Sequence, residues 1–115
     1  MKQIGSAVAL EVLSTGVVWT FAPALSVPRN DRWGRTYEGF AEEPELVGQL
    51  GSAFVKGLQG EGDEFLDENH ILATSKHFAG DGGTFDGIDQ GDVRLSKEEF
   101  YSCLLYTSDA ADEVS

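Results

Sequence analysis

A lysine and a histidine stand side by side at Lys76 and His77, near the end of the apolar run 71–78 and directly before a loop rich in glycine and aspartate. A third basic residue, Arg35, lies in an earlier loop that also follows an apolar run. Protonated Arg, Lys and His side chains donate hydrogen bonds and accept none, so a ligand rich in hydroxyl oxygens suits them. The alternative for the Lys-His pair alone is an ordinary salt bridge at the end of a strand.

The elements before these loops alternate between helical and strand patterns. Residues 1–16 carry apolar side chains at helical spacing, which predicts an amphipathic helix rather than a signal peptide. Residues 17–22 are β-branched and aromatic in a near-continuous run that ends at Pro23. That pattern predicts a strand buried on both faces, as in a parallel sheet. A long loop over 24–41 follows, and loops of this length are usually functional.

The second half of the chain repeats this order. Pro44 stands at the first position of a predicted helix, acidic residues surround it, and Gly60 ends the apolar stripe that follows. A predicted strand over 71–78 and a loop over 79–94 come next. Ser96 and Glu99 have the spacing of a capping box, which predicts another helix. The alternation indicates an α/β fold with βα units and a parallel sheet.

Two parallel strands with three helices cannot cover both faces of a sheet or satisfy both of its edges. We therefore expect a partial (β/α)8 TIM barrel, with about two βα units and flanking helices. In such folds the active site lies at the carboxyl ends of the strands, where both long loops begin. Arg35, Lys76 and His77 are accordingly predicted to point into one pocket.

The composition limits the partners. The formal net charge of −12 argues against nucleic acid and against an anionic membrane surface. The sequence has no run of about 18 apolar residues, so no transmembrane helix is predicted. Cys103 is the single cysteine, which rules out an internal disulfide.

Three segments of the chain, in this order, carry a resemblance to a known family: residues 21–23, 27–38 and 76–82. They resemble the N-terminal barrel of the family 3 glycoside hydrolases, which are β-glucosidases, β-xylosidases and exo-acting glucanases. The resemblance runs from about Gly5 to Phe100, and residues 82–91 are most similar to the bacterial exo-glucosidase branch. One departure is Asn30, where the family commonly has aspartate.

The resemblance implies a retaining exo-acting β-glycosidase that hydrolyses terminal glucosyl or xylosyl residues of a β-glucoside or oligosaccharide. It implies that Arg35, Lys76 and His77 hold the hydroxyls of the sugar in the −1 subsite. Asp81 is expected to anchor the loop. Asp86, Asp89 and Asp92 have two equally weighted interpretations: they line the outer pocket, or they belong to a solvated acidic loop.

Retaining hydrolysis needs two carboxylates about 5 Å apart. In the family the nucleophile and the acid/base lie downstream of the Lys-His pair. We therefore expect no catalytic residue in this chain, an inactive isolated fragment, and completion by the rest of the barrel and a second domain. No cofactor or metal is expected. Localisation is left open, with a periplasmic or secreted enzyme favoured by the resemblance.

Residues 1–101 are assigned to the barrel fragment, and residues 102–115 resemble translated adapter sequence. The alternative for this tail is a native helix in which Leu104 and Leu105 pack. A rival function is an EF-hand-like calcium-binding module over 88–99, although Ile88 and Val93 then occupy the positions that need an oxygen ligand and a glycine. A non-catalytic sugar-binding module with the same Arg-Lys-His set is a third hypothesis.

Overall fold

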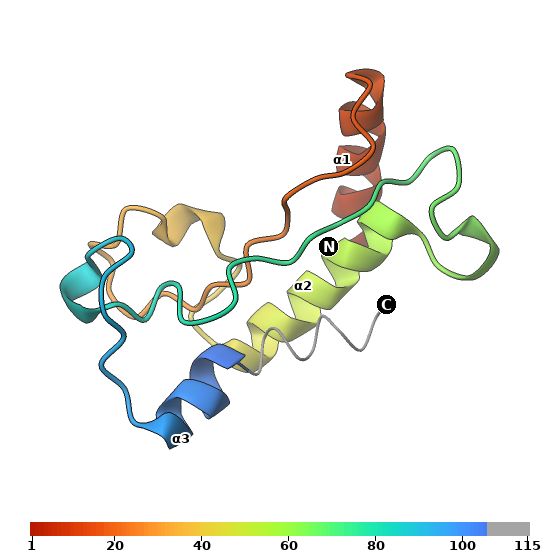
Figure 1. Cartoon of the computed structure of the whole chain (residues 1–115). Helices are drawn as coiled ribbons and strands as arrows, with labels where there is room; N and C mark the ends of the chain where they lie inside the picture. Colours follow the sequence, from red (N-terminus) through yellow and green to blue (C-terminus); the bar gives the residue numbers. More distant parts are fainter. Residues whose placement is uncertain (106–115) are drawn as a thin grey trace.

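The computed structural model describes residues 1–105 as helices joined by extended segments and loops (Figure 1). The α-helices are α1 (Lys2–Ser14), α2 (Pro44–Gln59) and α3 (Lys97–Phe100). Short 3-10 turns form η1 (Thr36–Glu38), η2 (Gly62–Glu64) and η3 (Phe85–Gly87), and a π-helical turn, η4 (Tyr101–Leu105), follows α3. The three predicted helices are confirmed. The tail residues 106–115 lie outside the described residues.

Helices α1 and α2 cross at a pair of glycines. A Cβ at Gly5 would meet the carbonyl oxygen of Phe54 in α2. A Cβ at Gly57 would likewise meet the carbonyl oxygen of Lys2 in α1. Beside this crossing, one core cluster contains Ala9, Leu58 and Ile71. Within residues 1–105, no helix is both long enough and apolar enough to span a membrane.

The ends of α2 follow the local signals in the sequence. Pro44 occupies the first turn, where a backbone N–H would have no hydrogen-bond partner within the helix, so proline loses nothing there. Gly60 follows the last turn with φ 73°. That φ is in the region that glycine adopts at little steric cost. At the N-terminal half of α2, a second core cluster contains Leu25, Val27, Val47 and Leu104.

The two segments predicted as strands lie side by side and parallel, but they do not form continuous strands. Figure 1 shows them running together from the α1 side toward the end where the two long loops gather. Isolated parallel bridges join Trp19 to Leu72 and Ala24 to Lys76. Between the bridges the second segment advances four residues and the first advances five, so the register slips by one residue. This extra residue interrupts the ladder in the manner of a β-bulge.

The prediction that residues 17–22 are buried on both faces is wrong for the described structure. Val18 is 67% exposed and Phe21 is 65% exposed, whereas Ile71 in the neighbouring segment is 1% exposed. Helices α1 and α2 pack over Ile71 through Ala9 and Leu58, but no described element covers the opposite side of residues 17–22 in the same way. Of the expected partial barrel, the described residues therefore show two parallel segments linked through α2, joined by isolated bridges and not by a continuous sheet.

Helix α3 begins with the predicted capping box. The Ser96 side chain accepts a hydrogen bond from the backbone N–H of Glu99, and the Glu99 side chain accepts one from the backbone N–H of Ser96. The following turn brings Leu104 into the second core cluster, where it is 4% exposed. Cys103 is a free, partly buried cysteine at the edge of that cluster.

Candidate functional site

The two long loops are tied to each other beyond the point where the extended segments end. The backbone N–H of Arg29 donates to the carbonyl oxygen of Gly82 at 2.9 Å. The indole Nε1 of Trp33 donates to Asp89 Oδ1 at 3.1 Å, and Trp33 itself is only 2% exposed. These contacts hold the loop after the first segment against the loop after the second. They place residues from distant parts of the sequence at one end of the molecule.

Arg35 is held by a carboxylate three residues further along the chain. Its Nε donates to Glu38 Oε1 at 2.7 Å and its Nη2 donates to Glu38 Oε2 at 2.8 Å. The hydrogen bonds raise the pKa of Arg35 and lower the pKa of Glu38, and burial of the pair opposes both shifts. Asp81 lies on the other side, with its Oδ2 at 3.8 Å from Arg35 Nη1. The guanidinium therefore lies between two carboxylates.

His77 joins Arg35 to the second loop. Its Nδ1 lies 2.5 Å from Asp81 Oδ2, and its Nε2 lies 3.4 Å from Arg35 Nη2. Because a guanidinium can only donate, Nε2 must be the acceptor in this contact. Nδ1 then carries the proton and donates it to Asp81, so the geometry fits the neutral Nδ1–H form of the imidazole.

Lys76 differs from Arg35 and His77 because its ammonium is free in the described part of the chain. Within residues 1–105, its Nζ has no hydrogen bond and no ion pair. The side chain lines a cavity of about 340 Å³, together with Glu38 and the aromatic residues Phe21, Tyr37, Phe40 and Phe54. The backbone of Lys76 is fixed by bonds to Pro23 and Leu25 in the first segment. The ammonium therefore extends from a fixed backbone, and the described residues use none of its three donors.

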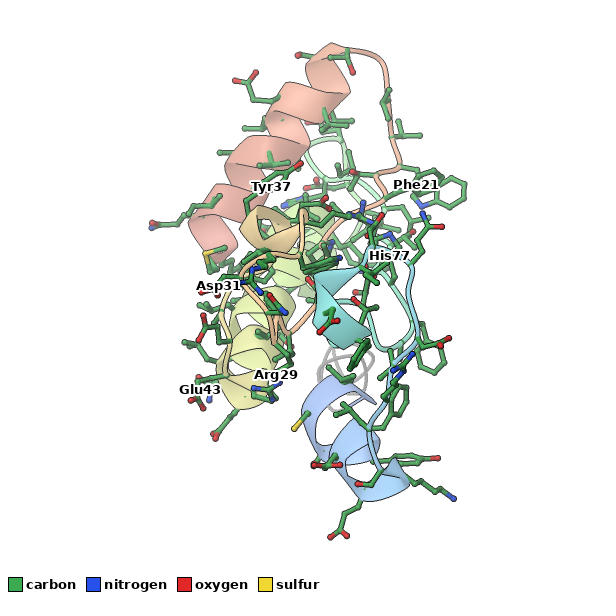
Figure 2. The ribbon with its side chains drawn as sticks, turned by 90° about the vertical axis from the view of Figure 1, so that its left-hand side faces the viewer. Phe21, Arg29, Asp31, Tyr37, Glu43 and His77 are labelled. Atoms are coloured by element: carbon green, nitrogen blue, oxygen red, sulfur yellow. The ribbon has the colours of Figure 1, made fainter. Side chains whose placement is uncertain are left out.

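Figure 2 shows the molecule with its side chains, turned by 90° from the view of Figure 1. His77 and Phe21 lie on the same side in that view, whereas Arg29 and Glu43 lie together near the start of α2. The Arg29 side chain donates to the carbonyl oxygen of Glu42 at 3.3 Å. Arg29 is therefore engaged in holding the loop to α2.

The remaining aspartates predicted near the site separate into two groups. Asp81 contacts both Arg35 and His77, and Asp89 binds the buried Trp33 indole. Asp86 is exposed in η3, and no contact joins it to Arg35 or His77 in the described part of the chain. The Asp92 carboxylate faces Arg94 at 3.9 Å instead, with both side chains exposed.

The sequence analysis missed Glu38, although it forms the shortest contacts of Arg35. The available signal was the three-residue spacing of Arg35 and Glu38 across Thr36 and Tyr37, which brings two side chains together in one helical turn. No cluster of three His, Cys, Asp or Glu side chains that could hold a metal ion occurs within residues 1–105.

Comparisons with known proteins identify the family. The family model for the glycosyl hydrolase family 3 N-terminal domain matches residues 1–111, so the chain belongs to this family. A β-xylosidase of Formosa agariphila is 39% identical over 112 residues, which are 96% of this chain and 16% of the relative. A periplasmic β-glucosidase of Salmonella typhimurium is 31% identical over 102 residues, which are 89% of this chain and 13% of the relative.

Solved structures agree with this assignment. The exo-1,3/1,4-β-glucanase from a Pseudoalteromonas species is 43% identical with a TM-score of 0.91, over 96% of this chain and 14% of that one. A variant β-glucosidase from Listeria innocua, solved with laminaribiose, is 33% identical with a TM-score of 0.92, over 99% of this chain and 16% of that one. The chain thus spans about one sixth of the length of these relatives or less.

Proposed function

We propose that this chain supplies sugar-binding residues to a retaining exo-acting β-glycosidase that hydrolyses terminal β-D-glucosyl or xylosyl residues. In this proposal Arg35, Lys76 and His77 bind hydroxyl groups of the sugar in the −1 subsite, the position of the residue that is released. The observation that carries the proposal is the meeting of Arg35 and His77 at 3.4 Å, beside a lysine whose ammonium is free in the described structure.

A hydroxylated ring is the ligand that this donor set fits best. A glycosidase has to stabilise an oxocarbenium-like transition state, and hydroxyl hydrogen bonds that strengthen in that state contribute several kcal/mol. The Lys76 ammonium supplies three donors, and the neutral form of His77 supplies an acceptor if the sugar displaces Arg35 from Nε2. The names of the relatives, which are β-glucosidases, a β-xylosidase and an exo-glucanase, support a sugar substrate.

The proposal assigns the reacting carboxylates to other parts of the enzyme. A nucleophile and an acid/base, about 5 Å apart, would come from the remainder of a (β/α)8 barrel and from a second domain. The two parallel segments joined through α2, and the exposed apolar side chains of residues 17–22, support such a larger barrel around this chain. The periplasmic relative supports an exported enzyme.

A chimeric enzyme tests the proposal. Residues 1–101 of this chain would replace the matching segment of the Pseudoalteromonas exo-1,3/1,4-β-glucanase, and the product is called the chimera below. We expect the chimera to hydrolyse an aryl β-glucoside, and the same assay on the isolated chain to give no turnover. Turnover by the isolated chain would contradict the placement of the catalytic carboxylates elsewhere. A folded chimera without glucosidase or xylosidase activity would contradict the proposed function.

A further inference from the structure

We propose that Glu38 is a positioning residue that fixes the guanidinium of Arg35 through a two-point contact, so that Arg35 can act on the sugar together with His77. The inference rests on the proposed function, because it assigns Glu38 a task within the same site. Glu38 acts through Arg35 and is not proposed to touch the sugar.

The geometry of the Arg35–Glu38 pair supports this role. Both carboxylate oxygens are used, one by Nε at 2.7 Å and the other by Nη2 at 2.8 Å. A two-point contact of this kind fixes the plane of the guanidinium as well as its position, which a lysine in place of Arg35 could not reproduce. The two side chains are 27% and 23% exposed, so neighbouring residues also restrict their motion.

The direction of the remaining Arg35 donors follows from this contact. With Nε and one edge of Nη2 occupied by Glu38, the rest of the guanidinium faces the second loop. Nη2 lies 3.4 Å from His77 Nε2, and Nη1 lies 3.8 Å from Asp81 Oδ2. Glu38 therefore orients the Arg35 guanidinium toward the Lys76-His77 pair at the end of the second segment. Without this contact, the longer ion pair with Asp81 would be the carboxylate contact left, within residues 1–105, to hold the guanidinium near His77.

Glu38 also compensates the positive charge that gathers at this point. Besides Arg35, Lys76 lowers the pKa of Glu38 through its charge, so the carboxylate lies near both of these predicted sugar-binding cations. It lines the same cavity as Lys76. A glutamine at position 38 would keep the size of the side chain but would lose this charge and one of the two acceptors.

A double-mutant cycle in the chimera tests the role. Glu38→Gln should lower kcat/KM for an aryl β-glucoside about ten- to a hundredfold, as expected for the loss of a hydrogen bond between charged groups. The same substitution in an Arg35→Ala background should have an effect of less than about threefold, because the group that Glu38 positions is absent. Glu61→Gln is the matched control, since Glu61 also bridges two cations, Lys2 and Lys56, away from the site. It should leave kcat/KM unchanged.

The outcomes separate the inference from the proposed function. If Arg35→Ala itself has no effect on an active chimera, Arg35 is not in the sugar site and the proposed function fails. If Arg35→Ala lowers kcat/KM but the Glu38→Gln effect is equally large in both backgrounds, or no larger than that of Glu61→Gln, the positioning role fails.

A second measurement uses the 115-residue chain itself and does not depend on catalysis. In ¹⁵N–¹H spectra we expect the Arg35 Nε–H signal to be protected from exchange with water in the parent chain. Glu38→Gln should reduce that protection at least tenfold, whereas Glu61→Gln should not change it. Equal protection in the parent chain and the Glu38→Gln variant would overturn the inference.

Discussion

Replacing Lys76 by alanine should impair catalysis without weakening the fold. Its Nζ has no hydrogen bond or ion pair within residues 1–105, so the substitution breaks no direct contact of the ammonium there. Only the longer-range attraction between Lys76 and Glu38 is lost. If the ammonium donates to a sugar hydroxyl, and this bond strengthens in the transition state, its removal should cost about 2–4 kcal/mol in kcat/KM. That cost corresponds to a decrease of about 30- to 900-fold.

The assay is hydrolysis of an aryl β-glucoside by the chimera, with kcat and KM measured separately. A panel of monodeoxy substrates should show that the Lys76→Ala effect shrinks for the analogue that lacks the hydroxyl bound by Lys76. Lys56→Ala is the matched control, because Lys56 lies on α2 and its Nζ pairs with Glu61 at 3.2 Å. An unchanged kcat/KM for Lys76→Ala, or an equal loss for Lys56→Ala, would refute the reasoning.

Three further predictions concern stability, measured as the free energy of unfolding of the chain in urea. Gly57→Ala should destabilise it by about 1–3 kcal/mol or more, because the new Cβ would meet the α1 backbone, whereas Gly34→Ala, in open space, should be neutral. Ser96→Ala should cost about 1 kcal/mol through the loss of the capping box, and an unchanged value would contradict the observed cap. Glu38→Gln should be destabilising at pH 7, and this destabilisation should shrink as the pH falls below 4.5, because the hydrogen bond from Arg35 lowers the pKa of Glu38 from that ordinary value. The ionised Glu38 side chain stabilises the fold at pH values above its ordinary pKa, and this stabilisation is lost as the pH falls through the lowered pKa. A destabilisation by Glu38→Gln that grows in acid would contradict this sign.

The helices could be predicted from sequence because their ends depend on short-range interactions. Pro44 in the first turn, Gly60 after the last turn and the Ser96–Glu99 capping box all act within one helical turn, and all three appear in the structure as predicted. The contact between the two long loops was also expected, because parallel segments bring their carboxyl ends to the same edge. The bridge between Ala24 and Lys76 shows this parallel arrangement.

The burial of residues 17–22 could not be predicted because it depends on partners far away in sequence. An apolar run shows that a segment can be buried on both faces, but only neighbouring elements decide whether it is. In the described structure Val18 and Phe21 remain mostly exposed. The one-residue slip between the two bridges was equally hidden, since the alternation of side chains in residues 17–25 does not mark where an extra residue falls. Glu38 was missed for a different reason: hydrogen-bond donors in a sequence do not reveal which of many carboxylates will hold them.

The distribution of contacts among the three basic residues bears on how the site could bind a sugar. Two of them, Arg35 and His77, are held by carboxylates, and the third, Lys76, is free within the described residues. Fixed groups need little reorganisation when charge develops in a transition state, which is the main advantage of a preorganised site. A free ammonium, in contrast, can bond to a ligand without first breaking a bond to the protein. Loss of Lys76 should therefore change kcat/KM alone. Loss of Arg35 should change both kcat/KM and the free energy of unfolding, because it leaves Glu38 and Asp81 without their shared cation.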